Sequence, residues 1–336
     1  MSEKGHAVAL FSGGLDSALA VLLILRQNIK VTALTFMTHF GCDITDKSSC
    51  AQDSSDMSEK FGFTVKMVHL GHQFVEIVKN PKYGHGKNMN PCIDCRILML
   101  RQAKQFMDTV GADFIFTGEV IGQRPMSQRR PQLDTVLRDS ELAGKLVRPL
   151  SAKLLPPTEP ELSGLLDREK LERISGRSRK RQMELARELG LEDYPSPAGG
   201  CLLTDVGYSR RLRDLLNYKP DVDFDDLNLL KVGRHFRLDE NTKIVSGRNE
   251  EENNKIERYR KNGEWMFEAK DTGSPITLLK GELTEASIQA AAAITARYCR
   301  LKNNPEVKIS YFRDGDEDHN ITVAPESEIM LNQRRI

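Results

Sequence analysis

An alternation of short apolar runs with amphipathic segments over the first 150 residues is the strongest constraint on the fold. Buried strands are predicted at 6–11, 30–37, 63–69, 113–117 and 145–148, and helices at 17–28, 46–61, 72–79 and 94–110. Strands that alternate with helices indicate a parallel sheet that is covered on both faces. The sequence therefore predicts an α/β domain.

The alternation stops near residue 150, where the proline-rich stretch LLPPTEP (154–160) follows. The next predicted elements are helices at 161–174 and 178–190, then strands at 229–232, 242–246, 264–269, 276–279 and 307–312 with helices at 250–260 and 284–298. We therefore expect three parts: the α/β domain over 1–155, a helical extension over 156–206, and a smaller α+β domain over 207–336.

Charge and hydropathy exclude some classes of protein. The formal net charge of +1 excludes a globally basic nucleic-acid binder but allows a local basic patch. No apolar run reaches the roughly 20 residues of a membrane span, and the first residues do not resemble a signal peptide, so we predict a cytoplasmic protein without a membrane partner. Six cysteines are too few for a disulfide scaffold. Closely spaced cysteines in a reducing compartment indicate metal binding or catalysis.

The stretch SGGLDS follows the first strand and opens the first helix. Its polar and small residues are Ser12, Gly13, Gly14, Asp16 and Ser17. Glycines let the backbone approach a ligand, and free N–H groups at a helix N-terminus favour an anion. Asp16 is unusual beside an anion, unless it caps the helix or acts through Mg²⁺. The stretch is neither a Walker A loop nor a G-x-G-x-x-G fingerprint. The alternative is a tight turn without a ligand.

Three cysteines are candidates for a reactive or metal site. Cys92 and Cys95 form a C-x-x-C pair at the start of a predicted helix, and Cys201 follows two glycines. Three thiolates suit a [4Fe–4S] cluster with one open iron, or a zinc ion with an exchangeable position. Alternatively, Cys95 and Cys201 form a nucleophile and persulfide pair, or the pair is simply buried. The remaining cysteines are expected to be packed thiols.

The residues Ser12-Gly13-Gly14-Leu15-Asp16-Ser17 resemble the SGGxDS signature of the PP-loop ATP pyrophosphatases, which have the fold of the adenine nucleotide alpha hydrolases (HUP). Within that family, the segment from Thr117 to Gln123, with Ser127 and Gln128, is similar to the TGExxGQxxSQ segment of 4-thiouridine synthetases. The resemblance covers about residues 6–205 and implies bound ATP and Mg²⁺. The residues that it implies for the cofactor site are Ser12, Gly13, Gly14, Asp16, Ser17, Phe36, Gly118 and Gln123.

The same resemblance assigns roles to the cysteines. Cys95 and Cys201 occupy the positions of the two catalytic cysteines of 2-thiouridine synthetases, and with Cys92 they match the pattern of cluster-dependent thiolases. It therefore implies Cys92, Cys95, Cys201 and Asp16 as catalytic residues, with the three cysteines as ligands of a [4Fe–4S] cluster. The resemblance does not extend to the additional N-terminal RNA-binding domain of the family or to its rhodanese-like domain with a persulfide cysteine. A separate sulfur donor is therefore expected.

The predicted function is ATP-dependent tRNA thiolation, with 4-thiouridine favoured over 2-thiouridine. The partners implied are tRNA and a sulfide or persulfide carrier, and a homodimer is left open. A persulfide route through Cys95 and Cys201 to 2-thiouridine competes with the cluster-dependent route. Three further hypotheses remain: a PP-loop ligase that acts on a small molecule, an RNA-binding protein without catalysis, and a metal-storage or redox role of the C-x-x-C pair alone, which would leave the SGGLDS loop unexplained.

The C-terminal part resembles the RNA-associated NFACT-R module, through the stretches at 229–253 and 291–313. Basic residues are frequent at 168–181 and 210–213, but interleaved glutamates make a solvated helix face an equal alternative to phosphate binding. The single tryptophan, Trp265, is expected in the core rather than as a stacking platform.

Overall fold

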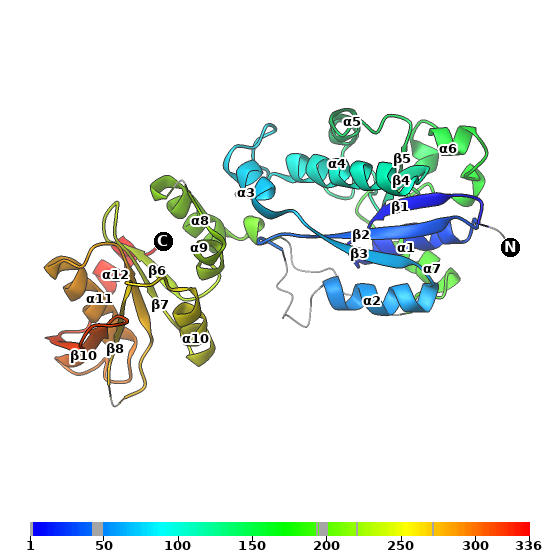
Figure 1. Cartoon of the computed structure of the whole chain (residues 1–336). Helices are drawn as coiled ribbons and strands as arrows, with labels where there is room; N and C mark the ends of the chain where they lie inside the picture. Colours follow the sequence, from blue (N-terminus) through cyan, green and yellow to red (C-terminus); the bar gives the residue numbers. More distant parts are fainter. Residues whose placement is uncertain (1–2, 42–49, 193, 195–200, 220, 271) are drawn as a thin grey trace. The chain divides into compact units, whose positions relative to one another are not determined.

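A computed structural model describes residues 3–41, 50–192, 194, 201–219, 221–270 and 272–336, with the side chains of 50–55 left out. The chain divides into two compact units, Met1–Asp205 and Val206–Ile336, called the N-terminal and C-terminal domains (Figure 1). The start of the helix predicted at 46–61, most of the loop before Cys201, and the side chains of Cys42 and Cys50 lie outside the described residues.

The N-terminal domain is built on a parallel sheet with the strand order β3-β2-β1-β4-β5. Its strands are β1 (His6–Leu10), β2 (Lys30–Met37), β3 (Thr64–His69), β4 (Phe114–Thr117) and β5 (Leu146–Val147). Four of the five residues of β1 and all of β4 are buried, as expected for strands with helices on both faces. The predicted parallel α/β fold is confirmed.

Helices cover both faces of this sheet (Figure 1). They are α1 (Leu15–Leu25), α2 (Cys50–Phe61), α3 (Gly71–Lys79), α4 (Cys92–Val110), α5 (Arg130–Asp139), α6 (Glu159–Leu162) and α7 (Lys180–Glu188). One core contains α1 with residues of α2 and α7, and the other contains α4 with Val136 of α5. Helix α1 is apolar all round because it is enclosed between the sheet and α7.

The helix predicted at 161–174 is wrong. The structure has only α6 and a single 3-10 turn at Arg168–Lys170 there. Gly164 adopts φ +78, which ends α6, and the carboxylate of Asp167 accepts a hydrogen bond from the backbone of Glu169 and starts the separate turn. Local capping therefore overrides the apolar spacing that predicted one long helix.

The C-terminal domain contains an antiparallel sheet with the strand order β11-β10-β8-β9-β7-β6. The strands are β6 (Arg234–Arg237), β7 (Lys243–Ser246), β8 (Trp265–Glu268), β9 (Thr277–Lys280), β10 (Val307–Phe312) and β11 (His319–Val323). The helices are α8 (Val206–Tyr218), α9 (Phe224–Leu229), α10 (Glu250–Tyr259), α11 (Glu285–Tyr298) and α12 (Glu328–Arg334). The alanine-rich α11 packs against the sheet in one core with Trp265, so the predicted α+β domain and the core position of Trp265 are confirmed.

The strand predicted at 229–232 is wrong. Asp223 accepts a hydrogen bond from the backbone of Asp226 and caps α9, which includes the first of these residues. Gly233 then turns the chain with φ +75, and β6 begins at Arg234. The turn before the strand displaces its start by several residues.

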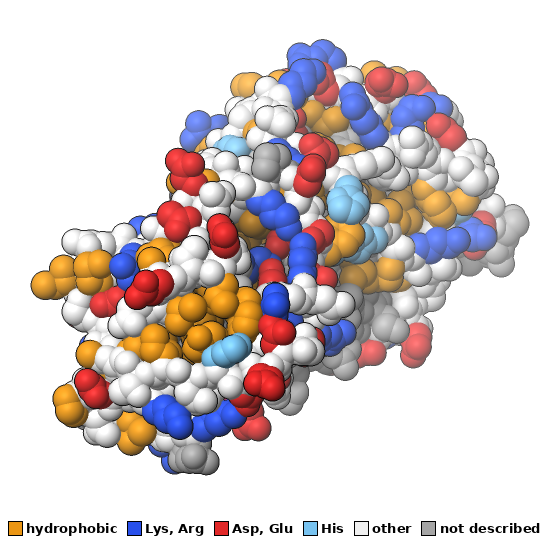
Figure 2. All heavy atoms as spheres, turned by 60° about the vertical axis from the view of Figure 1, so that its left-hand side comes forward, with side chains coloured by type: hydrophobic (Ala, Val, Ile, Leu, Met, Phe, Trp, Pro, Cys, Tyr) orange, Lys and Arg blue, Asp and Glu red, His pale blue; other side chains and the backbone are white. Residues whose placement is uncertain are grey.

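The face drawn in Figure 2 carries Lys and Arg side chains interspersed with Asp and Glu. This mixture agrees with 49 basic and 48 acidic residues in the chain. Among the described residues, none of the helices combines the length and the hydrophobicity that a membrane crossing requires. The predicted cytoplasmic location stays a prediction.

Candidate nucleotide and thiol site

The loop between β1 and α1 is shaped for an anion. Gly13 has φ +73, and Gly14 is the N-cap of α1 and has no side chain with which to accept the first-turn N–H groups. The Ser17 hydroxyl donates to the carbonyl of Gly14 at 2.8 Å and accepts from the backbone N–H of Ser12 at 3.3 Å. The loop therefore holds its own shape and leaves the N-terminus of α1 open to a negatively charged group.

The segment after β4 packs directly on this loop. A Cβ at Gly118 would lie 2.6 Å from the backbone of Asp16 and Ser17, so this position accepts only glycine. Five residues further on, Nε2 of Gln123 donates to Oδ2 of Asp16 at 2.8 Å. Strand order reverses between β1 and β4, and the crevice at such a reversal is where open α/β sheets bind ligands.

Two oxygen atoms at this position lack partners. Oδ1 of Asp16 and Oε1 of Gln123 are buried and have no hydrogen-bond partner among the described residues. Mg²⁺ in nucleotide sites takes one or two protein oxygens, phosphate oxygens and water. These two atoms therefore fit a nucleotide-bound Mg²⁺. Phe36 lies near the carboxyl end of β2, which pairs with β1, and packs at the border of the core around α4.

The three predicted site cysteines lie close together. Cys92 and Cys95 are in the first turn of α4, and all three thiols are half-buried and outside disulfides. Burial raises the pKa of Cys95 to about 12, and Cys201 and Cys92 are near enough to raise it further, whereas Arg96 lowers it. Burial also raises the pKa of Cys92, against the effect of Arg96 and Arg124. As placed, Cys92 and Cys95 are therefore neutral thiols.

Cys201 is held by contacts to two distant loops. Its Sγ lies 3.4 Å from the carbonyl oxygen of Phe40, and the N–H of Leu202 donates to that same oxygen. The N–H of Met89 donates to the carbonyl of Leu203, and Asn88 donates to the carbonyl of Thr204 at 2.7 Å. These contacts join the segment after Cys201 to the loop before Cys92, which brings thiols more than 100 residues apart in the sequence to one place.

The donor set agrees with an iron–sulfur cluster in chemistry but not in placement. Three cysteines are the ligand type that such clusters use. Within residues 3–41, 50–192, 194, 201–219, 221–270 and 272–336, however, no three His, Cys, Asp or Glu side chains are arranged to hold a metal ion. The present arrangement of the thiols does not fit a cluster.

A buried carboxylate links helix α4, which carries Cys92 and Cys95, to the sheet. Glu119 is 2 % exposed; its Oε2 accepts from Nε of Arg148 at 2.9 Å, and its Oε1 lies 3.2 Å from Nε of Arg96. The two arginines hold the pKa of Glu119 below its usual value, although burial acts to raise it. Arg96 directly follows Cys95, so this pairing fixes the first turn of α4 relative to β4.

Two cations lie near the loop: Arg124, which the sequence analysis did not single out, and Arg179, which belongs to the basic group predicted at 168–181. Partial desolvation and the neighbouring Arg96 lower the pKa of Arg124, whereas Asp16 and Cys92 act to raise it. Arg124 is therefore near both the SGGLDS loop and a site thiol. Arg179 lies 4.0 Å from Asp16. The sequence does contain a signal that could have identified Arg124, because this basic residue directly follows the predicted site residue Gln123.

Most of the basic residues predicted between 168 and 181 have acidic partners. Arg168 pairs with Glu161 at 2.5 Å, and Arg181 pairs with Glu172 at 2.6 Å and with Glu188 at 2.7 Å. The pairs of Arg181 support a solvated face of α7, whereas Arg168 holds a carboxylate that is almost completely buried. Arg179 differs because its acidic neighbour is in the nucleotide loop.

The fold and the site together define a class: a parallel-sheet domain with a phosphate-type loop at its switch point, followed by an antiparallel α+β domain. Residues 2–151 match the family described as thiamine biosynthesis protein (ThiI), and residues 233–334 match the NFACT protein RNA binding domain. These matches confirm both resemblances: the N-terminal domain is of the ThiI PP-loop type, and the C-terminal domain is of the NFACT-R type.

Curated relatives match the N-terminal part of the chain. The tRNA-specific 2-thiouridylase MnmA of Cytophaga hutchinsonii is 28% identical over 145 residues, which are 38% of this chain and 38% of that protein. A probable tRNA sulfurtransferase of Methanosarcina acetivorans is 30% identical over 132 residues, which are 37% of this chain and 29% of that protein. The chain thus spans well under half of the length of these relatives.

A solved structure described as a 4-thiouridine synthetase–RNA complex with bound ATP is similar at a TM-score of 0.37 and 20% identity, over 56% of this chain and 52% of that one. A likeness at this score adds nothing to the family matches.

Proposed function

We propose that the protein is an ATP-dependent tRNA thiolase that converts a uridine to 4-thiouridine. The observation that carries the proposal is the grouping of Cys92, Cys95 and Cys201, together with an arginine, Arg124, that is close to both Cys92 and Asp16 of the SGGLDS loop. The matches to the ThiI family over residues 2–151 and to an RNA-binding domain over 233–334 support the substrate class.

The first step in this proposal is adenylation. The target base leaves its stack, at a cost of a few kcal/mol, and its O4 attacks the α-phosphorus of ATP. The bond between the α-phosphorus and the bridging oxygen breaks, and pyrophosphate leaves toward the N-terminus of α1. Asp16 Oδ1 and Gln123 Oε1 would hold Mg²⁺, which supplies charge neutralisation at the phosphates. Arg124 and Arg179 stabilise the negative charge that develops on the leaving group.

The second step replaces oxygen by sulfur. A nucleophilic sulfur attacks C4 of the adenylated base, and AMP leaves with the original oxygen. The sulfur comes from a sulfide or persulfide carrier. Cluster binding by Cys92, Cys95 and Cys201 stays a prediction, and iron and acid-labile sulfide content with a brown colour after anaerobic purification tests it.

The persulfide route is the second candidate, and the proximity of the Cys95 and Cys201 thiols supports it. In this route to 2-thiouridine, O2 of the base is the adenylated oxygen, and a persulfide on Cys95 attacks C2 and expels AMP. The Cys201 thiolate then attacks the Cys95 sulfur of the resulting disulfide, which releases the thiolated base and leaves a Cys95–Cys201 disulfide for a thiol reductant. Trapping that disulfide by alkylation and mass spectrometry after a single turnover tests this route.

The test of the function as a whole is sulfur incorporation into tRNA with the variants Asp16→Asn and Cys201→Ser. We expect both to lose ATP-dependent thiolation, while nucleoside chromatography of the wild-type product identifies 4-thiouridine. Cys299→Ser is the matched control, because Cys299 is buried in the C-terminal domain, where its thiol donates to the carbonyl of Ala296. Full activity of either site variant would contradict the proposal, and a 2-thiouridine product would contradict the position.

A further inference from the structure

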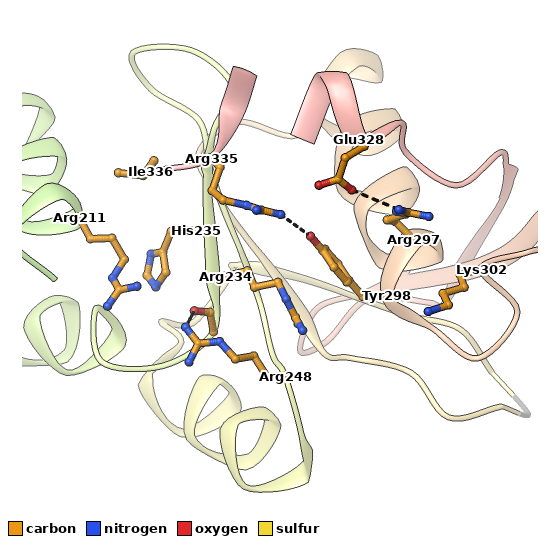
Figure 3. Close-up of a pocket in the computed structure, with 11 residues that line it drawn as sticks. Arg211, Arg234, His235, Arg248, Arg297, Tyr298, Lys302, Glu328, Arg335 and Ile336 are labelled. Carbon is orange, nitrogen blue, oxygen red and sulfur yellow. Dashed lines mark hydrogen bonds and ion pairs between the residues drawn. The ribbon is translucent and has the colours of Figure 1, made fainter. Parts of the chain in front are cut away.

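The C-terminal domain contains a pocket of about 380 Å³ that is lined mainly by basic side chains (Figure 3). The lining comes from β6, the end of α11 and the last residues of the chain, together with single residues of neighbouring segments. A pocket of this volume accommodates a small molecule or one unit of a polymer. The charges of the lining residues, and the groups that they contact, indicate what kind of ligand the pocket suits.

Some of the cations around the pocket are neutralised within the domain. Arg297 pairs with Glu328 at 3.2 Å, and Arg248 pairs with Glu252 at 3.3 Å while donating to the carbonyl of Gly233 at 2.8 Å. These two arginines therefore have structural roles that account for their positions.

Arg234 and Arg335 are different. Neither makes an ion pair within the described residues, and both point into the pocket (Figure 3). Nη1 of Arg234 donates to the carbonyl of Gly247 at 2.9 Å, and Nη2 of Arg335 donates to the hydroxyl of Tyr298 at 2.9 Å. Nε of Arg335 is buried and has no hydrogen-bond partner in the part of the chain that the structure describes. Two guanidinium groups are thus held in place by neutral acceptors, and their charge remains available.

Both arginines are fixed before any ligand binds. Arg234 is in β6, and its guanidinium carbon lies 4.1 Å from the centre of the Tyr298 ring. Arg335 forms a β-bridge with Phe236, and the N–H of Ile336 donates to the carbonyl of His235 at 3.0 Å. Because a guanidinium already covers one face of Tyr298 and its hydroxyl is used, this ring is poorly placed to stack a nucleobase. The pocket therefore suits a charged group rather than a base.

We propose that this pocket binds a phosphate of RNA, with Arg234 and Arg335 as the phosphate-binding residues and Tyr298 as a positioning residue for both. The identity of the polymer rests on the proposed function. Paired guanidinium groups match the geometry of phosphate oxygens, and such a contact positions RNA without reading its sequence. The phosphate is either a terminal monoester or an internal diester, which share this chemistry.

The test measures binding of the full chain to single-stranded RNA of one length, with a 5′-phosphate or a 5′-hydroxyl and in two base sequences. We expect Arg234→Gln and Arg335→Gln each to weaken binding about tenfold and to reduce the salt slope by about one, equally for both sequences. Loss of a 5′-phosphate preference in the variants identifies a terminal phosphate. An equal loss for both ends identifies an internal one.

The matched control is Arg258→Gln, because Arg258 is exposed on α10 and does not line the pocket. Unchanged fluorescence of Trp265 verifies that each variant is folded. Wild-type affinity in both pocket variants, or an equal loss in Arg258→Gln, would overturn the inference. Sulfur transfer is assayed separately: RNA binding that depends on the pocket without thiolation would defeat the proposed function only, and thiolation with unaltered binding by the pocket variants would defeat this inference only.

Discussion

Arginines gather in both domains, but their partners differ. In the N-terminal domain, Arg148 is 4 % exposed and lies against the buried carboxylate of Glu119. In the C-terminal domain, Arg234 and Arg335 contact a carbonyl, a phenol and an aromatic ring. A carboxylate cancels the charge of the arginine that it holds, whereas a neutral acceptor orients the guanidinium and leaves its field intact. The partner, rather than the abundance of arginine, separates a structural cation from one that can bind an anion.

The largest effect is expected when the buried carboxylate loses its charge. Glu119→Gln leaves Arg148 buried without a counter-charge and should lower the free energy of unfolding by about 3–5 kcal/mol. Thermal unfolding followed by circular dichroism measures the change. The double variant Glu119→Met with Arg148→Met serves as the control, since it removes the charges at both positions and should recover much of the loss. An unfolding temperature of Glu119→Gln equal to that of the wild type would contradict the role of Glu119 as the counter-charge of the buried Arg148.

Lys243 tests the opposite case, a buried cation that shares its carboxylate. It lies 3.3 Å from Asp214, which also binds Arg237, and burial lowers its pKa to about 8. The unfolded chain, with the ordinary lysine pKa of 10.5, then binds more protons between pH 8 and 10.5, so stability should rise with pH across this window. The rise is at most about 3 kcal/mol.

Urea unfolding followed by Trp265 fluorescence measures this rise, because the single tryptophan of the chain lies in β8 of the same domain. Lys243→Met should lack the rise. Equal pH dependence in the variant and the wild type would show that Asp214 fully compensates Lys243.

Arg124 should affect binding rather than stability. Arg124→Gln is expected to weaken ATP binding by about tenfold, since a charge-assisted hydrogen bond contributes roughly 1.5–3 kcal/mol. Isothermal titration calorimetry with ATP and Mg²⁺ measures it. Arg129→Gln is the control, because Arg129 is exposed as Arg124 is, but lies at the N-cap of α5. An ATP affinity that is equal in both variants would contradict a role of Arg124 in the nucleotide site.

The smallest effect is expected at an exposed ion pair. Arg181 is 39% exposed and pairs with Glu172 and Glu188, and hydrogen bonds to both raise its pKa. Arg181→Gln should lower the free energy of unfolding by less than about 1 kcal/mol, because solvent screens the pair. Chemical denaturation monitored by circular dichroism decides this. A loss as large as that of Glu119→Gln would mean that burial does not govern these arginines.

The sequence predicts much of the fold because its main signals are local. Apolar runs predict the five parallel strands within a few residues, and the SGGLDS motif predicts the loop after β1. Where local capping or a glycine turn intervenes, as at Gly164 and Gly233, the prediction is wrong. Strand β11 (HNITV) and helices α5, α8, α9 and α12 were not predicted from the sequence.

The candidate sites could be predicted only in part. The three cysteines follow from spacing and resemblance, but the contacts of the segment after Cys201 with Phe40 and Met89 span many residues and have no local signal. The basic pocket unites Arg234 and Arg335, which are separated by about 100 positions of sequence. Long-range pairing of this kind is a property of the folded chain rather than of any window along it.

The division of the chain after Asp205 has an evolutionary consequence. All three site cysteines and the SGGLDS loop precede it, and Cys201 is anchored to loops of its own domain. A gene fusion that exchanged everything from Val206 onward would leave each candidate reacting group in its setting. The candidate reacting groups and the basic pocket of the C-terminal domain would therefore be free to change independently of each other.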